Sequence, residues 1–142
     1  MTGMSNYKVL VVDDDLDIVE TIVFMLRSRG FNVITAYDGS EGLIKVRERQ
    51  PDIIILDLMM PQMDGFEMCH KLKNDEATKN IPVIVLTARS DSEARYKAHK
   101  SAADDYIVKP FDLPTLVTKI NKFLSSDDSG SEKKEKKFDD WR

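Results

Sequence analysis

The chain has 142 residues, which is enough for one domain with a sizeable hydrophobic core. Its hydrophobic fraction of 42% and charged fraction of 32% are ordinary for a soluble globular protein, and its net charge of -4 argues against a general attraction to nucleic acid or to an anionic membrane. The lone cysteine excludes an intramolecular disulfide, and neither a signal peptide nor an apolar run of roughly 20 residues is present, so we expect a cytoplasmic protein.

Five short apolar runs, rich in Val and Ile, are the predicted β-strands. Turn or polar residues bound each run, and the runs are almost continuously apolar, which is typical of strands covered on both faces of a sheet. In chain order they are residues 9–12, 33–36, 53–56, 83–86 and 106–108.

Five segments with helical periodicity alternate with these strands. We expect Asp15 to cap the first helix and Gly30 to end it, while Asp112 caps the fifth and Pro114 lies in its first turn. The fourth helix, at about 92–101, is polar and only weakly periodic. The apolar positions of the other four are Leu16, Val19, Ile22, Val23 and Leu26; Gly42, Leu43 and Val46; Phe66, Cys69 and Leu72; and Leu116, Val117, Ile120 and Phe123.

This alternation predicts an α/β domain with a doubly wound, five-stranded parallel sheet and five helices, because parallel neighbours need crossover connections. We expect the domain to cover residues 7–125, after a short leader at 1–6. Residues 126–142 are rich in Ser and mixed charge, so we expect a disordered charged tail or linker there.

Polar residues follow four of the predicted strands at their carboxyl ends, where open parallel sheets bind ligands. Asp13 and Asp14 follow the first strand, Asp57 the third, Thr87 the fourth and Lys109 the fifth. Three carboxylates that converge repel one another and need a cation. Oxygen ligands without His or Cys favour a hard ion such as Mg²⁺, which also bridges to phosphate.

Asp57 is the strongest candidate for chemistry at this edge of the sheet. It ends the apolar run IIILD of the predicted central strand, and a buried carboxylate is costly unless it is paired. A metal held jointly with Asp13 and Asp14 would pair it, and a carboxylate can itself act as a nucleophile that forms an aspartyl phosphate. The ammonium of Lys109 and the hydroxyl of Thr87 suit two further phosphoryl oxygens.

Four sequence fragments carry a family resemblance. In chain order they are LVVDDD, LDLMMPQMDG, IVLTAR and DDYIVKPF, and the resemblance that they carry covers about residues 7–124. Together they resemble the receiver domain of bacterial two-component response regulators, including the chemotaxis regulators. The resemblance implies a flavodoxin-like fold with strand order 2-1-3-4-5. It also implies a signalling switch, not an enzyme, which takes a phosphoryl group from a sensor histidine kinase or phosphotransfer protein and then binds a downstream protein target.

The resemblance further assigns roles at the acidic edge. It implies that Asp57 is the phosphoacceptor and that Asp13 and Asp14 form the acid pair, with Asp14 the more direct ligand of Mg²⁺ and Asp13 acting largely through water. The backbone carbonyl of Met59 is the third protein ligand that the resemblance implies.

Three more residues receive switch roles from the same resemblance. Thr87 is expected to move its hydroxyl to the phosphoryl group. Lys109 is expected to pair with that group, and its peptide bond to Pro110 is expected to be cis. Tyr106 is expected to turn inward when Thr87 moves. The face made by the fourth helix, fifth strand and fifth helix then changes shape.

Two features of the chain depart from the family pattern or modify it. Ala102 stands where the family usually has Gly, and a positive φ there would cost about 1 kcal/mol or more. Met59 and Arg89 lie two residues after Asp57 and Thr87, where side chains in the family modulate access of water to the phosphoryl group.

Other notable residues have structural interpretations. We expect Pro61, Asp64 and Gly65 to shape a loop and to start the third helix, and Cys69 to fill space in the core. No DNA-binding domain is recognisable, so we expect no direct contact with nucleic acid or membrane, and the chain is either a stand-alone regulator or part of a longer one.

Two other classes of protein remain as alternatives. A phosphohydrolase with an aspartate nucleophile shares the metal and the covalent chemistry, but such enzymes usually carry a second Asp two residues after the nucleophile, where this chain has Met59. A flavodoxin-like electron carrier shares the fold, but it needs a phosphate loop rich in Ser, Thr and Gly after the first strand, where this chain has DDD.

Overall fold

The computed structural model describes residues 7–88 and 92–124. The predicted leader at 1–6, Arg89 and the predicted tail at 126–142 lie outside the described residues. Within them, no helix combines the length and the hydropathy that crossing a bilayer would require.

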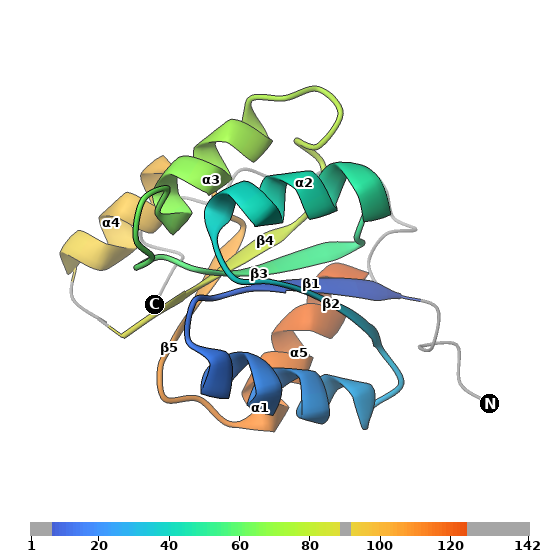
Figure 1. Cartoon of the computed structure of the whole chain (residues 1–142). Helices are drawn as coiled ribbons and strands as arrows, with labels where there is room; N and C mark the ends of the chain where they lie inside the picture. Colours follow the sequence, from blue (N-terminus) through green and yellow to red (C-terminus); the bar gives the residue numbers. More distant parts are fainter. Residues whose placement is uncertain (1–6, 89–91, 125–142) are drawn as a thin grey trace.

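Five parallel strands form one sheet in the order β2-β1-β3-β4-β5 (Figure 1). Each predicted strand is present, with ends that differ by no more than one residue from the prediction, and the strand order implied by the resemblance is confirmed. The strands are β1 (Lys8–Val12), β2 (Asn32–Ala36), β3 (Ile53–Asp57), β4 (Val83–Thr87) and β5 (Asp105–Val108).

Five helices connect the strands and cover both faces of the sheet, which confirms the doubly wound fold class. Two of them, α1 and α5, lie on one face, and the other three lie on the opposite face (Figure 1). The helices are α1 (Leu16–Arg27), α2 (Gly39–Arg49), α3 (Gly65–Lys73), α4 (Ser92–Lys100) and α5 (Leu113–Leu124).

The strand side chains alternate between two hydrophobic cores, because successive residues of a strand point to opposite faces. In β1, Val9 and Val11 pack on the side of α1 and α5, whereas Leu10 and Val12 pack on the side of α2, α3 and α4. Every residue of β3 and β4 is buried, while the edge strands β2 and β5 include half-buried positions. Burial on both faces explains why the central strands are continuously apolar.

Aspartate side chains start the first and last helices as predicted. Asp15 accepts hydrogen bonds from the backbone N–H groups of Asp17 at 3.0 Å and Ile18 at 3.3 Å. Asp112 accepts one from the N–H of Thr115 at 2.8 Å. Helix α1 ends at Arg27, earlier than the predicted stop at Gly30. Gly30 lies three residues beyond the end of the helix and has a φ of 93°.

The predicted buried face of the first helix was wrong at Leu16, which is 61% exposed. Leu16 opens α1 beyond the end of β1 at Val12, so the helix begins at a level where that strand has already ended. The predicted burial of Val19, Ile22 and Leu26 is confirmed.

The turn between α4 and β5 contains Ala102 in the left-handed conformation, with φ of 68°. Its N–H donates to the carbonyl of His99 at 2.9 Å and closes the end of the helix. The positive φ considered for this position is therefore present, although alanine occupies it.

Candidate functional site

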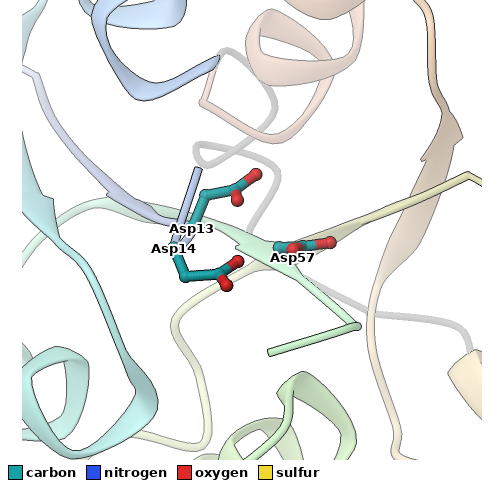
Figure 2. Close-up of side chains that lie close together, drawn as sticks. All are labelled: Asp13, Asp14 and Asp57. Atoms are coloured by element: carbon teal, nitrogen blue, oxygen red, sulfur yellow. The ribbon is translucent and has the colours of Figure 1, made fainter. Parts of the chain in front are cut away.

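The carboxyl ends of β1 and β3 bring three aspartates together. Asp13 and Asp14 directly follow β1, and Asp57 is the last residue of β3. One carboxylate oxygen of each lies within 4.8 Å of the others, and Figure 2 shows the three side chains gathered around a common space. The strands are neighbours with Val12 opposite Leu56, so the register of the sheet itself places Asp13 beside Asp57.

The three carboxylates differ in their access to solvent. Asp13 is fully buried and Asp57 is 5% exposed, whereas Asp14 is exposed. A cation that binds the cluster can therefore approach from the side of Asp14 and reach the two buried carboxylates behind it.

Lys109 places a positive charge between the two buried carboxylates. Its Nζ lies 3.1 Å from Oδ2 of Asp13 and 3.4 Å from Oδ1 of Asp57. The residue follows β5, and its peptide bond to Pro110 is cis, as the resemblance implied. This ammonium, predicted to lie near a phosphoryl group, already pairs with the carboxylates of Asp13 and Asp57.

Backbone donors orient the same two carboxylates. Oδ1 of Asp13 accepts a hydrogen bond from the N–H of Asp15 at 3.0 Å, and Oδ1 of Asp57 accepts one from the N–H of Met59 at 3.3 Å. Both donors lie two residues after their acceptors, in the turns that leave β1 and β3. The side chain of Met59 is 65% exposed.

The environment of Asp57 raises the pKa of its carboxyl to about 6. Burial is the largest cause, and the nearby charge of Asp13 adds to it, while Lys109 and the N–H of Met59 act in the opposite direction. Ionisation of Asp57 is therefore unfavourable in the folded protein, and a further positive charge in the cluster would make it more favourable.

Thr87 and Tyr106 lie on one face of the sheet, on adjacent strands. Thr87 is the buried last residue of β4, and its carbonyl accepts the N–H of Lys109 at 2.7 Å. Tyr106 is opposite Val85 in the register and packs on the core that contains Val85. Because Val85 and Thr87 are two residues apart, their side chains point to that same face.

The start of α3 lies directly against the backbone around Asp57. A Cβ atom on Gly65 would lie 2.2 Å from the carbonyl oxygen of Asp57 and 2.7 Å from Cα of Leu58. Asp64 caps the helix by accepting the N–H of Glu67 at 2.9 Å. Their predicted role in starting the third helix is confirmed, and the need for glycine comes from this close approach.

Cys69 fills core space, as predicted, and takes no part in the acidic cluster. Its Sγ donates to the carbonyl of Ser101 at 3.3 Å, and burial raises the pKa of the thiol to about 11. The thiol is therefore neutral at physiological pH.

The fold and the acidic cluster define a class of protein, and the family comparison identifies it. The model of the response regulator receiver domain matches residues 9–121, so the chain belongs to that family of signalling switches. The DNA-binding dual master transcriptional regulator RpaA of Synechocystis sp. is 38% identical over 121 residues, which cover 85% of this chain and 50% of RpaA. The DNA-binding response regulator MtrA of Mycobacterium tuberculosis is 39% identical over 121 residues, which cover 85% of this chain and 52% of MtrA.

Solved structures of receiver domains show the same fold. The chemotaxis protein CheY4 of Vibrio cholerae is 34% identical with a TM-score of 0.79, covering 83% of this chain and 98% of that one. The receiver domain of the Francisella response regulator 1452 is 35% identical with a TM-score of 0.78, and the match covers 84% of this chain and 98% of that domain. This chain spans about half the length of the curated relatives it matches but nearly all of these solved domains.

Proposed function

We propose that this chain accepts a phosphoryl group on Asp57 with the help of Mg²⁺ and thereby switches its binding to a protein partner. The observation that carries the proposal is the convergence of Asp13, Asp14 and Asp57 within 4.8 Å at the carboxyl edge of the sheet. The ammonium of Lys109, which contacts two of these carboxylates, supplies a positive charge beside them.

The donor set suits a hard divalent cation. The cluster offers carboxylate oxygens without His or Cys, which favours Mg²⁺ over softer metals. Asp13, Asp14 and Asp57 would hold the ion together with the backbone carbonyl of Met59. When bound, the ion would neutralise charge between Asp57 and an incoming phosphoryl group.

The transfer reaction follows from these groups. A carboxylate oxygen of Asp57 attacks phosphorus and forms the O–P bond, while the N–P bond of a phosphohistidine on a sensor histidine kinase or phosphotransfer protein breaks and the electron pair stays on nitrogen. Lys109 and Thr87 hold phosphoryl oxygens during this step. Later attack by water on phosphorus returns the carboxylate and releases phosphate.

The switch connects this site to a surface. Thr87 moves toward the phosphoryl group, and Tyr106, on the same face of the sheet, turns into the space that Thr87 leaves. The face formed by α4, β5 and α5 then presents a different shape to a downstream protein target. The supporting observations are the buried position of Thr87 and the packing of Tyr106 against the adjacent core.

We propose that residues 7–125 act through protein contacts, without direct contact with nucleic acid or membrane. RpaA and MtrA are named as DNA-binding proteins, but the match covers about half of each. Their DNA binding is therefore not carried over to this chain, whose net charge of -4 gives no general attraction to nucleic acid.

The two alternative functions have weaker support. A phosphohydrolase of the aspartate class would need an acid where the exposed Met59 stands. A flavin carrier would need to bind phosphate at Asp13 and Asp14, whose negative charges repel it. A colourless purified protein would argue against the flavin alternative.

Phosphorylation by a small donor tests the proposed function. Acetyl phosphate with Mg²⁺ should raise the intact mass by one phosphoryl unit in the wild type and leave Asp57→Asn unchanged. The adduct should be lost in mild alkali and hydroxylamine, because it is an acyl phosphate. A stable adduct, or equal labelling of Asp57→Asn, would refute phosphorylation at this carboxylate.

A further inference from the structure

The loop between β3 and α3, residues 58–64, carries Met59 and is tied at both ends. The N–H of Leu58 donates to the carbonyl of Leu86 at 3.0 Å, and the N–H of Gly65 donates to the carbonyl of Leu58 at 3.0 Å. Among the described residues, 60–63 form no hydrogen bond with the rest of the protein. Side-chain packing therefore decides where this middle stretch lies.

Two methionines provide that packing. Met60 is buried in the core between the sheet and helices α2, α3 and α4, and the half-buried Met63 packs on the same core. Pro61 and Gln62 between them are exposed. The loop is thus held by two side chains. Met60 immediately follows Met59, and Met63 lies four residues after Met59.

Met63 rests on Gly39, the first residue of α2. A Cβ atom on Gly39 would lie 2.9 Å from the carbonyl oxygen of Met63 and 3.0 Å from both its Cγ and its Sδ. Gly39 does not have a positive φ, so backbone conformation does not require glycine there. The absence of a side chain serves the contact with Met63.

We propose that Gly39 is a positioning residue for the metal site. By allowing α2 to touch Met63, it sets the position of the loop whose Met59 carbonyl would complete the ligand set beside Asp57. Helix α2 contributes no ligand, so it would act on the site only through this contact. The inference rests on the proposed function, in which Mg²⁺ binds at Asp13, Asp14 and Asp57.

A second glycine of the same helix provides a matched control. A Cβ on Gly42 would meet Cε of Met68 at 2.8 Å, Sδ of Met68 at 3.0 Å and Cγ1 of Val12 at 3.3 Å. These are side-chain atoms, and the nearest is the end of a flexible chain that can move. Met68 also belongs to α3, outside the loop, so Gly42→Ala adds the same methyl group to α2 without displacing the backbone of residue 63.

The experiment compares Gly39→Ala and Gly42→Ala in the full chain by NMR. Without Mg²⁺, Gly39→Ala should move the amide resonances of residues 59–64, and it should weaken Mg²⁺ binding about tenfold, as changes behind a metal ligand commonly do. Gly42→Ala should change resonances in α2 and α3 and keep the wild-type Mg²⁺ affinity. Met63→Ala removes the Cγ and Sδ atoms of this contact while keeping the backbone carbonyl, and it should also weaken binding, with less than additive effects in the double variant.

Two results would overturn the positioning role. One is a folded Gly39→Ala, or a folded Met63→Ala if the first does not fold, with wild-type loop resonances and wild-type Mg²⁺ affinity. The other is an equal loss of affinity in Gly42→Ala, which would indicate a general effect of α2. If the wild type itself bound no Mg²⁺, the proposed function would fail, while the metal-free loop resonances would still decide whether Gly39 positions the loop.

Discussion

The ammonium of Lys109 lies 3.1 Å from the carboxylate of Asp13, a residue 96 positions earlier in the chain. Asp13 is completely buried, so its charge depends on this partner more than an exposed carboxylate would. The pair joins the ends of β1 and β5 across the acidic edge. Its removal should therefore affect both the stability of the metal-free protein and the response to a phosphoryl group.

Lys109→Met should lower the free energy of unfolding of the metal-free protein by about 2 to 3 kcal/mol, because it leaves buried acids without their cation. Urea unfolding at neutral pH in the presence of a chelator measures the change. The matched control is Lys79→Met, whose ammonium pairs at 3.0 Å with the exposed Glu76 and should contribute less than about 1 kcal/mol. Equal losses in both variants would contradict a special role for the Lys109 pair.

Asp57→Asn should stabilise the metal-free protein, and the gain should depend on pH. The pKa of Asp57 is raised to about 6 in the folded state, so ionisation of this group opposes folding. The wild type should lose stability relative to the variant as pH rises from about 4 to about 6, and the difference should level off near 1 to 3 kcal/mol above that range.

Urea unfolding of both proteins between these pH values checks the prediction. Glu20→Gln, which removes a carboxylate from an exposed position on α1, serves as the control. A wild type that is as stable as Asp57→Asn at neutral pH would show that the buried charge carries no cost.

Mg²⁺ should shift amide resonances around Asp13, Asp14 and Asp57, and Asp14→Ala should abolish these shifts at the same Mg²⁺ concentration. Asp14 is exposed, so the substitution removes a ligand with little effect on the core. Asp17→Ala, also exposed and three residues away, serves as the control and should bind like the wild type. Persistence of the shifts in Asp14→Ala would exclude the assigned metal site.

The conformational response to a phosphoryl group should require the ammonium of Lys109. Beryllofluoride with Mg²⁺ stands in for the phosphoryl group, and in the wild type it should shift amides of α4 and of residues near Tyr106. In Lys109→Ala these distant shifts should shrink, because a smaller difference in binding free energy between two states moves the population less. Equal distant shifts in both proteins would remove Lys109 from the switch.

Ala102→Gly should stabilise the protein by about 1 kcal/mol, because alanine has φ of 68° there and glycine adopts such angles without penalty. Thermal or urea unfolding measures the gain. Ala77→Gly, at an exposed turn position without positive φ, should instead lower stability by about 0.4 to 1 kcal/mol. A loss of stability in Ala102→Gly would show that the left-handed turn is not strained.

Much of the fold could be predicted because it rests on local patterns. The apolar runs of β3 and β4 are buried on both faces, and aspartates such as Asp15 cap helices through contacts within three residues. The convergence of Asp13, Asp14 and Asp57 also followed from the alternation, since the carboxyl ends of parallel strands meet at one edge. The roles assigned to these residues remain predictions from the family resemblance.

The features that sequence analysis missed depend on distances between elements. Leu16 was predicted to be buried from helical spacing alone, and spacing does not show which turn of a helix lies beyond the edge of the sheet. The pairing of Lys109 with Asp13 depends on how closely two strand ends approach across the sheet. The sequence alone gave no role to Gly39, and only the position of Met63, 24 residues later, shows what this glycine accommodates.

The acidic edge has a consequence for folding, because its groups come from strands that are distant in the chain. Asp13, Asp57, Thr87 and Lys109 stand at the ends of β1, β3, β4 and β5. Each link between them closes a long loop, whose entropy must be lost before the contact forms, and such nonlocal parallel pairing is slow. A partly folded chain without β5 in place has no complete cluster. An ion or phosphoryl group that requires the complete cluster would therefore stabilise the fully assembled sheet relative to partly folded states of the chain.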